Sequence, residues 1–134
     1  MSKIDLKYGL NKVGLPLIVT SNNPNLCFLI DTGATHNVIF SFVVKALRDN
    51  ITITGEGAKI SGIDGSEHDT KTLSISLQIE DKEIPVDFNM MEATEIVRKV
   101  QEESGVQIHG ILGVPFLDEH KCVLDFDTQT FQYD

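Results

Sequence analysis

The sequence has no tryptophan, only two cysteines and few basic residues: 11 of 134 residues are Lys or Arg. Cys27 and Cys122 each lie among apolar residues of an expected strand, which predicts small buried thiols rather than a disulfide framework. The basic residues are scattered among 20 acidic ones, and a net charge of −9 would repel a phosphate backbone. Nucleic acid is therefore not expected as a partner, and the acidity is expected only to keep the domain soluble.

Long apolar runs are also absent, and none approaches the roughly 20 residues that a membrane-spanning helix needs. We therefore expect no membrane partner. The first residues, Met1–Lys7, have no uninterrupted apolar run behind their positive charges. This argues against a secretory signal peptide and favours a cytoplasmic location. No metal site is expected, because none of the four histidines has metal-ligand spacing with Cys or Asp. These histidines are His36, His68, His109 and His120.

The length of 134 residues predicts one domain, residues 1–134, with one compact core. Its pattern is that of short, mostly antiparallel strands separated by turn residues. Thr72 to Ile79 alternates apolar and polar residues as the return strand of a glycine-rich hairpin, and Pro85 predicts an edge or bulge position in the strand that follows. The other expected strands are 15–20, 26–30, 84–88, 108–113, 122–126 and 130–133.

Two or three helices are expected between these strands. Ser41 is suited to cap a helix that runs through Leu47, with Asn50 ending it. The helix with the most regular spacing runs from Met91 to Ser104, and Gly105 is expected to stop it. A short helix from Pro115 to Glu119 begins with a proline. In the helix 91–104 the residues expected to share one apolar face are Ala93, Ile96, Val97 and Val100.

One carboxylic acid, Asp31, stands at the end of an unbroken apolar run and is followed by the small residues of an Asp-Thr-Gly triplet. A strand end fixes the backbone, and Gly33 leaves room for a substrate to come close. This favours a catalytic carboxylate. The alternative is a structural aspartate that caps a turn through its side chain. The triplet alone does not decide, because it occurs by chance in a few per cent of chains of this length.

Two blocks of the sequence together carry a resemblance to a known family. The first is Leu29 to Ile39, reading Leu-Ile-Asp-Thr-Gly-Ala-Thr-His-Asn-Val-Ile, and the second is Gly110-Ile111-Leu112-Gly113, followed by Phe116-Leu117, His120-Lys121 and Val123-Leu124-Asp125. They resemble the two signatures of the retropepsin-like aspartic proteases, single-domain enzymes of retroviruses, retrotransposons, cells and bacteria. The resemblance implies a mainly β fold, a closed β-barrel with a flap hairpin.

The resemblance also implies the chemistry. Hydrolysis of a peptide bond without a metal, a cofactor or a nucleophilic side chain needs a water held between a base and an acid, and two neighbouring carboxyl groups that share one proton supply both. The chain has one Asp-Thr-Gly triplet and cannot hold two copies of the fold. An active enzyme is therefore expected to be a homodimer, with the two Asp31 carboxyls at its axis and a peptide or protein as substrate.

By the same resemblance, Asp31 is the catalytic acid and base, Thr32 bonds across the dimer axis, and Gly33 contacts the substrate backbone. Ala34 stands where many two-domain relatives have a serine or threonine, and without that hydroxyl we expect activity nearer neutral pH. The flap that would close over a peptide consists of Ile60, Ser61, Gly62, Ile63 and Asp64. For Asp64 a solvated turn residue is the alternative.

The sequence also departs from the retroviral pattern. Thr35 and Val114 stand where retroviral members have an acidic residue and an arginine that brace the dimer. The helix 91–104 is longer than the connection in minimal members. Because the bracing pair is missing and the sequence does not define the tip of the flap, a second hypothesis is kept, in which the chain is a peptide-binding or dimerisation module that has the fold but has lost efficient hydrolysis.

Overall fold

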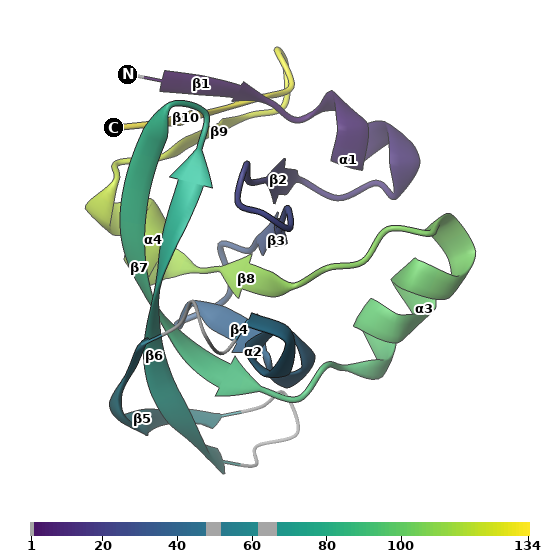
Figure 1. The fold of residues 1–134 in the computed structure, drawn as a ribbon. Helices are drawn as coiled ribbons and strands as arrows, with labels where there is room; N and C mark the ends of the chain where they lie inside the picture. Colours follow the sequence, from purple (N-terminus) through teal and green to yellow (C-terminus); the bar gives the residue numbers. More distant parts are fainter. Residues whose placement is uncertain (1, 48–51, 62–66) are drawn as a thin grey trace.

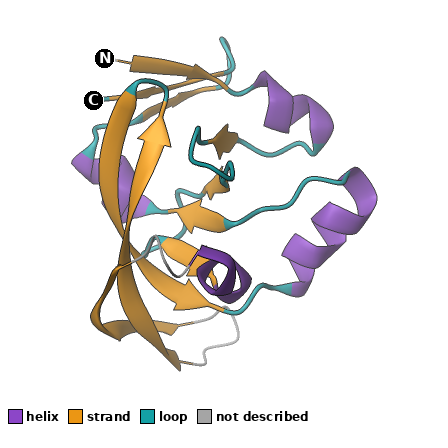
Figure 2. Ribbon diagram, viewed as in Figure 1, coloured by secondary structure: helices purple, strands orange, loops and turns teal. Residues whose placement is uncertain are grey.

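The structure, a computed structural model, describes residues 2–47, 52–61 and 67–134, and the side chains of 2–47 and 72–134. Its elements are arranged as short strands with four helices between them in the described ranges (Figures 1 and 2). They are β1 (Ser2–Asp5), α1 (Lys7–Lys12), β2 (Leu17–Val19), β3 (Cys27–Ile30), β4 (Val38–Phe40), α2 (Ser41–Leu47), β5 (Thr52–Ser61), β6 (Glu67–Ile79), β7 (Lys82–Met91), α3 (Glu95–Ser104), β8 (Gly110–Leu112), α4 (Val114–Glu119), β9 (Val123–Asp125) and β10 (Thr130–Tyr133).

Seven strands form one sheet in the order β2-β3-β8-β4-β7-β6-β5, and three form a second in the order β1-β10-β9. The seven-stranded sheet curls as a half-barrel, with the long ribbon of β6 and β7 on one side and α2 and α3 on the other (Figure 1). Among the described strands, the pairs β3 with β8 and β4 with β7 are parallel, and the others are antiparallel. The expectation of a mainly β, mostly antiparallel fold is confirmed.

The three neighbouring strands β3, β8 and β4 form the part of the sheet that positions the candidate site. Strand β8 comes from late in the chain and lies between two early strands, parallel to β3 and antiparallel to β4. Ile30 is in register with Leu112, and Ile39 with Gly110. The loop from residue 31 to residue 37 therefore leaves the sheet next to the end of β8.

Apolar side chains of the sheet, among them those of β3, β6 and β7, fill the core. Alternation along β6 is confirmed, because its four apolar residues from 73 to 79 are all buried, and Phe28 of β3 stacks on Phe88 of β7 with ring centroids 5.4 Å apart. Pro85 pairs with Ser76 of β6, and β7 pairs with β4 only at residues 89–91. Within the described ranges, Pro85 therefore has a partner strand on one side only, as an edge position requires.

The helix expected over 91–104 begins later than predicted. Strand β7 continues to Met91, which pairs with Phe40 of β4, and Thr94 then caps α3 by accepting the Val97 N–H at 3.3 Å. Gly105, at φ 76°, ends the helix as expected. The prediction that Ile96 belongs to the buried face was wrong: Val97 is buried, but Ile96 is 73 % exposed.

Three elements were not expected from the sequence: β1, α1 and β4. Strand β1 pairs with β10 from Ser2↔Tyr133 to Asp5↔Thr130, so the two ends of the described chain lie side by side (Figure 1). Helix α2 spans the predicted residues, with Ser41 as its first helical residue directly after β4. Asn50, expected to end it, lies outside the described residues. None of the described helices has the length and apolar character needed to cross a membrane.

Candidate active site

Asp31 is the first residue after β3, where the chain leaves the core. Its backbone N–H donates to the carbonyl oxygen of Leu112 at 3.0 Å, which extends the β3–β8 pairing by one step. Ile30 and Leu112 are buried on the core side, whereas Asp31 is half-buried. A carboxyl group is thus held on a fixed backbone at the rim of the core, as the sequence predicted for a preorganised acid.

Among the described residues, the side chain of Asp31 is held through one of its two oxygens. Oδ1 accepts the backbone N–H of Gly33 at 2.9 Å, and the Asp31 carbonyl accepts the N–H of Ala34 at 3.2 Å. These bonds form a tight turn, so the turn-capping interpretation accounts for Oδ1. Oδ2 has no partner within the part of the chain that the structure describes. As far as the described residues go, this second carboxylate oxygen is therefore available to a water, a substrate or a second carboxyl.

The rest of the Asp-Thr-Gly loop faces outward. Thr32 and Gly33 are exposed and Ala34 is half-buried. A Cβ atom added to Gly33 would meet only the Asp31 Oδ1 atom, at 3.3 Å. Beyond it, the Thr35 hydroxyl and His36 Nδ1 are 3.0 Å apart. The structure therefore brings Asp31, Thr32, Gly33 and Ala34 together on one exposed loop.

Gly113, at the end of the second signature, and Val114 after it hold this loop in place by hydrogen bonds. Val114 N–H donates to the Ala34 carbonyl at 2.8 Å, and Gly113 N–H donates to Asn37 Oδ1 at 2.9 Å. A Cβ atom at Gly113 would lie 2.5 Å from the His36 oxygen and 2.7 Å from the Ala34 oxygen, so any side chain there would push the loop away. The glycine is thus required by close backbone approach.

Of the expected flap residues, the structure describes only the backbones of Ile60 and Ser61. Ile60 and Ser61 end β5, where their backbones pair with His68 and Glu67 of β6, so the hairpin that leads to the flap is present. The side chains of Ile60 and Ser61, and all of Gly62, Ile63 and Asp64, lie outside the described residues. Their contact with a substrate stays a prediction.

Two residues that support these strands were not singled out from the sequence: Asn37 beside the loop, and His109 at the other end of β3. Asn37 is a buried polar residue directly before β4, and because that strand was not expected from the sequence, no local pattern indicated Asn37. His109 precedes β8 and makes two hydrogen bonds to Cys27. Its ring atom Nδ1 accepts the backbone N–H of Cys27 at 2.9 Å, and its backbone N–H donates to the Cys27 carbonyl at 2.8 Å. Burial lowers the pKa of His109. It is an ordinary hydrogen-bonded histidine, as expected.

The two cysteines are free thiols, which confirms that they form no disulfide. Cys27 is buried and Cys122 half-buried, and burial raises the pKa of each thiol to about 11. Both are therefore protonated at neutral pH and poorly suited to act as nucleophiles. Among the described residues, no three His, Cys, Asp or Glu side chains are placed to hold a metal ion.

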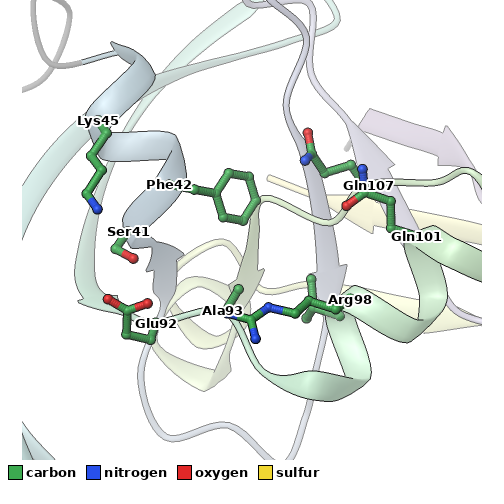
Figure 3. Close-up of a pocket in the computed structure, with 9 residues that line it drawn as sticks. Ser41, Phe42, Lys45, Glu92, Ala93, Arg98, Gln101 and Gln107 are labelled. Atoms are coloured by element: carbon green, nitrogen blue, oxygen red, sulfur yellow. The ribbon is translucent and has the colours of Figure 1, made fainter.

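A cleft of about 250 Å³ opens between α2 and α3, and Figure 3 shows its lining. The Lys45 and Glu92 side chains lie at one end beside Ser41, and Gln101 and Gln107 lie at the other, with the Phe42 ring between them. None of the lining residues belongs to the loop 31–37. The cleft is therefore not part of the site at Asp31.

Comparison with known proteins places this geometry in a family. The family model described as aspartyl protease matches residues 17–116, which include both the Asp31 loop and the end of β8. No curated protein matches the chain.

Three solved structures are similar in fold. The EIAV protease in complex with the inhibitor HBY-793 has a TM-score of 0.60 and 19 % identity, over 81 % of this chain and 90 % of that one. The retroviral protease-like domain of Ddi1 from Leishmania major has a TM-score of 0.58 and 12 % identity, over 90 % and 88 %. A retropepsin-like aspartic protease from Rickettsia conorii has a TM-score of 0.58 and 18 % identity, over 98 % and 89 %. The matched family model agrees with the geometry, in which the neighbouring strands β3, β8 and β4 hold the Asp-Thr-Gly loop. The chain belongs to the retropepsin-like aspartyl protease family.

Proposed function

We propose that the protein is an aspartic endopeptidase that acts as a homodimer and hydrolyses peptide bonds with a water activated between two Asp31 carboxyls. The observation that carries the proposal is the state of the Asp31 carboxyl. Its backbone is fixed to Leu112 and its Oδ1 to Gly33, while Oδ2 has no partner among the described residues. A preorganised acid with one open oxygen is what water activation requires.

The chemistry calls for a second carboxyl close to the first. Two carboxyls a few ångströms apart cannot both be ionised, so the pair holds one proton and contains a base and an acid at the same time. The base takes a proton from the water as its oxygen adds to the carbonyl carbon, and the acid donates one to the carbonyl oxygen. The proton taken up by the base then passes to the amide nitrogen, the hydroxyl of the adduct returns its proton to the other carboxyl, and the C–N bond breaks to give an acid and an amine. With a single Asp-Thr-Gly triplet in the chain, the second carboxyl comes from a second copy.

In this proposal the neighbouring loop residues have separate roles. The exposed Thr32 side chain bonds across the axis to its counterpart in the second copy, and Gly33 offers the substrate a backbone without a side chain in the way. Ala34 contributes to the substrate-binding surface. An extended peptide lies along this loop as an added strand, and the residues 60–64 close over it.

The test compares the wild-type protein with Asp31→Asn and with Asp118→Asn. Asp118 is an exposed aspartate on α4, so its replacement controls for the loss of one negative charge. Each protein is incubated with a broad peptide library across pH, and its sedimentation mass is measured in parallel. We expect a dimer and cleavage for the wild type and Asp118→Asn, and a dimer without cleavage for Asp31→Asn.

Other outcomes of this test discriminate clearly. Cleavage that persists in Asp31→Asn would reject the mechanism. A wild-type protein that dimerises and binds peptides but cleaves none would favour the alternative function, a peptide-binding or dimerisation module. One observation favours this alternative. Thr35 and Val114, both exposed, stand where retroviral members have the acidic residue and the arginine that brace the dimer.

A further inference from the structure

We infer that Asn37 is a positioning residue, whose buried side-chain amide holds the Asp31 loop against Gly113 and against β7. The inference rests on the proposed function, because it assigns a role in the peptidase reaction. Asn37 is 7 % exposed, and both ends of its amide are used: Oδ1 accepts the Gly113 N–H at 2.9 Å, and Nδ2 donates to the Asp87 carbonyl at 3.2 Å.

The first of these bonds belongs to a series of three. Going along the chain from the end of β8, the Leu112 carbonyl accepts from Asp31, the Gly113 N–H donates to the Asn37 side chain, and the Val114 N–H donates to Ala34. The outer two bonds join backbone to backbone. The middle one depends on a side chain, so it is the bond in this series that a substitution can remove.

The second bond connects the loop to a different part of the sheet. Asn37 reaches β7 twice, through Nδ2 to the Asp87 carbonyl and through its own carbonyl, which accepts the Asn89 N–H at 2.8 Å. Asn89 is in register with Thr72 of β6, and β6 forms the hairpin with β5 that leads to the residues 60–64. Asn37 thus links the loop with the catalytic acid to the hairpin expected to cover the substrate.

Asn22 offers a matched control elsewhere in the same molecule. Its Oδ1 accepts the Gln78 N–H at 2.9 Å, and its Nδ2 donates to the Ser76 carbonyl at 3.0 Å. This is the same pair of bonds to backbone groups. Asn22 lies in the turn that precedes β3, whereas Asp31 follows that strand. Loss of the Asn22 amide therefore tests the cost of such bonds to stability without touching the loop at Asp31.

The experiment measures kcat and KM for the dimeric wild type, Asn37→Ala and Asn22→Ala at a temperature where all three are folded. A catalytic group displaced by about 1 Å loses roughly 100-fold in rate. We therefore expect kcat to fall by about 10- to 100-fold in Asn37→Ala, with KM within about threefold of wild type. Asn22→Ala should keep wild-type kcat. Equal kcat in both variants would overturn the inference.

A second variant, Asn37→Asp, tests whether the amide's donor and acceptor are what matters. An ionised carboxylate keeps the acceptor for Gly113 but turns a second acceptor toward the Asp87 carbonyl, whereas a protonated carboxyl restores the donor. The activity of Asn37→Asp relative to wild type should therefore rise by about tenfold or more as pH falls and the carboxyl takes up a proton. A ratio that does not change with pH would contradict the inference.

Amide hydrogen exchange separates failure of this inference from failure of the proposed function, because it needs no activity. In Asn37→Ala we expect faster exchange at Gly113, Val114 and Asp31 than in Asn22→Ala, whose fast exchange should be confined to Gln78 and its neighbours. Unchanged exchange at these three amides in Asn37→Ala would overturn the role of Asn37. A wild type that cleaves no peptide would instead reject the endopeptidase proposal, and the exchange pattern would still decide whether Asn37 holds the loop.

Discussion

The backbone N–H of Asp31 donates to the carbonyl of Leu112 at 3.0 Å, although the two residues lie in different halves of the sequence. The bond continues the parallel pairing of β3 with β8, so the position of the carboxyl depends on a strand that is added much later along the chain. Gly113 and Val114 continue the same contact toward Asn37 and Ala34. The geometry at Asp31 therefore depends on the pairing of β3 with β8 and is not set by the Asp-Thr-Gly triplet alone.

Gly113→Ala should damage both stability and activity. The added methyl group would lie 2.5 Å and 2.7 Å from the carbonyl oxygens of His36 and Ala34, which are backbone atoms that cannot move alone. Overpacking of this kind costs about 1–3 kcal/mol, and displacement of the loop should lower kcat by at least about tenfold. Urea unfolding and peptide cleavage measure the two effects.

The control for this substitution is Gly105→Ala. Gly105 has a left-handed φ of 76°, and a Cβ atom added there would meet no described atom within 4 Å, so an alanine is strained by its backbone conformation alone. We expect a loss of about 1 kcal/mol in the free energy of unfolding and unchanged kcat. If Gly113→Ala behaved in the same way, the close contact with the Asp31 loop would have no role in catalysis.

Much of the fold follows from local patterns in the sequence. The alternation over residues 72–79, the hairpin formed by β9 and β10, and the span of α2 are all confirmed, because each is set by neighbouring residues. Strands β1 and β4 are different. Each is only three or four residues long, and its partners lie far along the chain. Strand β1 pairs with β10, and β4 pairs with β7 and β8. Their pairing is a tertiary effect that a local pattern does not reveal.

The start of α3 and the surroundings of Asp31 show the same limit. A helical pattern begins at Met91, but pairing of Met91 with Phe40 keeps that residue in β7 until Thr94 can cap the helix. For the site, resemblance located Asp31 and the glycine at 113. It did not indicate Asn37, because its partners Gly113 and Asp87 become neighbours only once β8 and β7 are in place.

Val114→Asp should weaken the dimer. Val114 is 44 % exposed, and its N–H bonds to Ala34, so it lies directly beside the loop that the proposed dimer places at its axis. A charge introduced into that contact would be buried without a partner. We expect the dimer dissociation constant to rise by about tenfold or more, as measured by sedimentation equilibrium.

Val19→Asp is the matched control for Val114→Asp. Val19 is 47 % exposed and pairs with Cys27 at the end of β3 that is opposite to Asp31. The same substitution at a similarly exposed valine should leave the dissociation constant unchanged. Equal weakening by the two variants, or none by either, would mean that Val114 does not contact the second copy.

Ala34→Ser should move the pH profile of cleavage toward acid. Ala34 is half-buried beside Asp31, and its N–H already donates to the Asp31 carbonyl. A hydroxyl at this position can donate to the ionised pair of carboxyls and stabilise that form to lower pH. The measurement is kcat/KM against pH for the wild type and the variant. A profile that stays in place would show that the residue at 34 does not reach the carboxyls.

Stability should fall as pH is lowered through the range in which His109 takes up a proton, and His109→Asn should reduce this effect. Burial lowers the pKa of His109 from its ordinary value of 6.5. Its Nδ1 accepts the Cys27 N–H, so a proton at Nδ1 would also break that bond. As pH falls below about 6.5, the unfolded chain therefore binds this proton before the folded one does. The contribution to stability is fully present above pH 6.5 and is lost as pH falls toward the folded pKa.

The size of this slope is bounded, since one proton accounts for at most about 1.4 kcal/mol per pH unit. In His109→Asn the amide oxygen can still accept from Cys27, but the residue no longer titrates. Urea unfolding at pH 5 to 8 should give a shallower decline for the variant than for the wild type. The difference between the two proteins at pH 8, where both side chains are neutral, measures the packing cost alone. Parallel pH curves for the two proteins would show that His109 does not contribute to the pH dependence, whereas curves that approach one another as pH falls would show that it does.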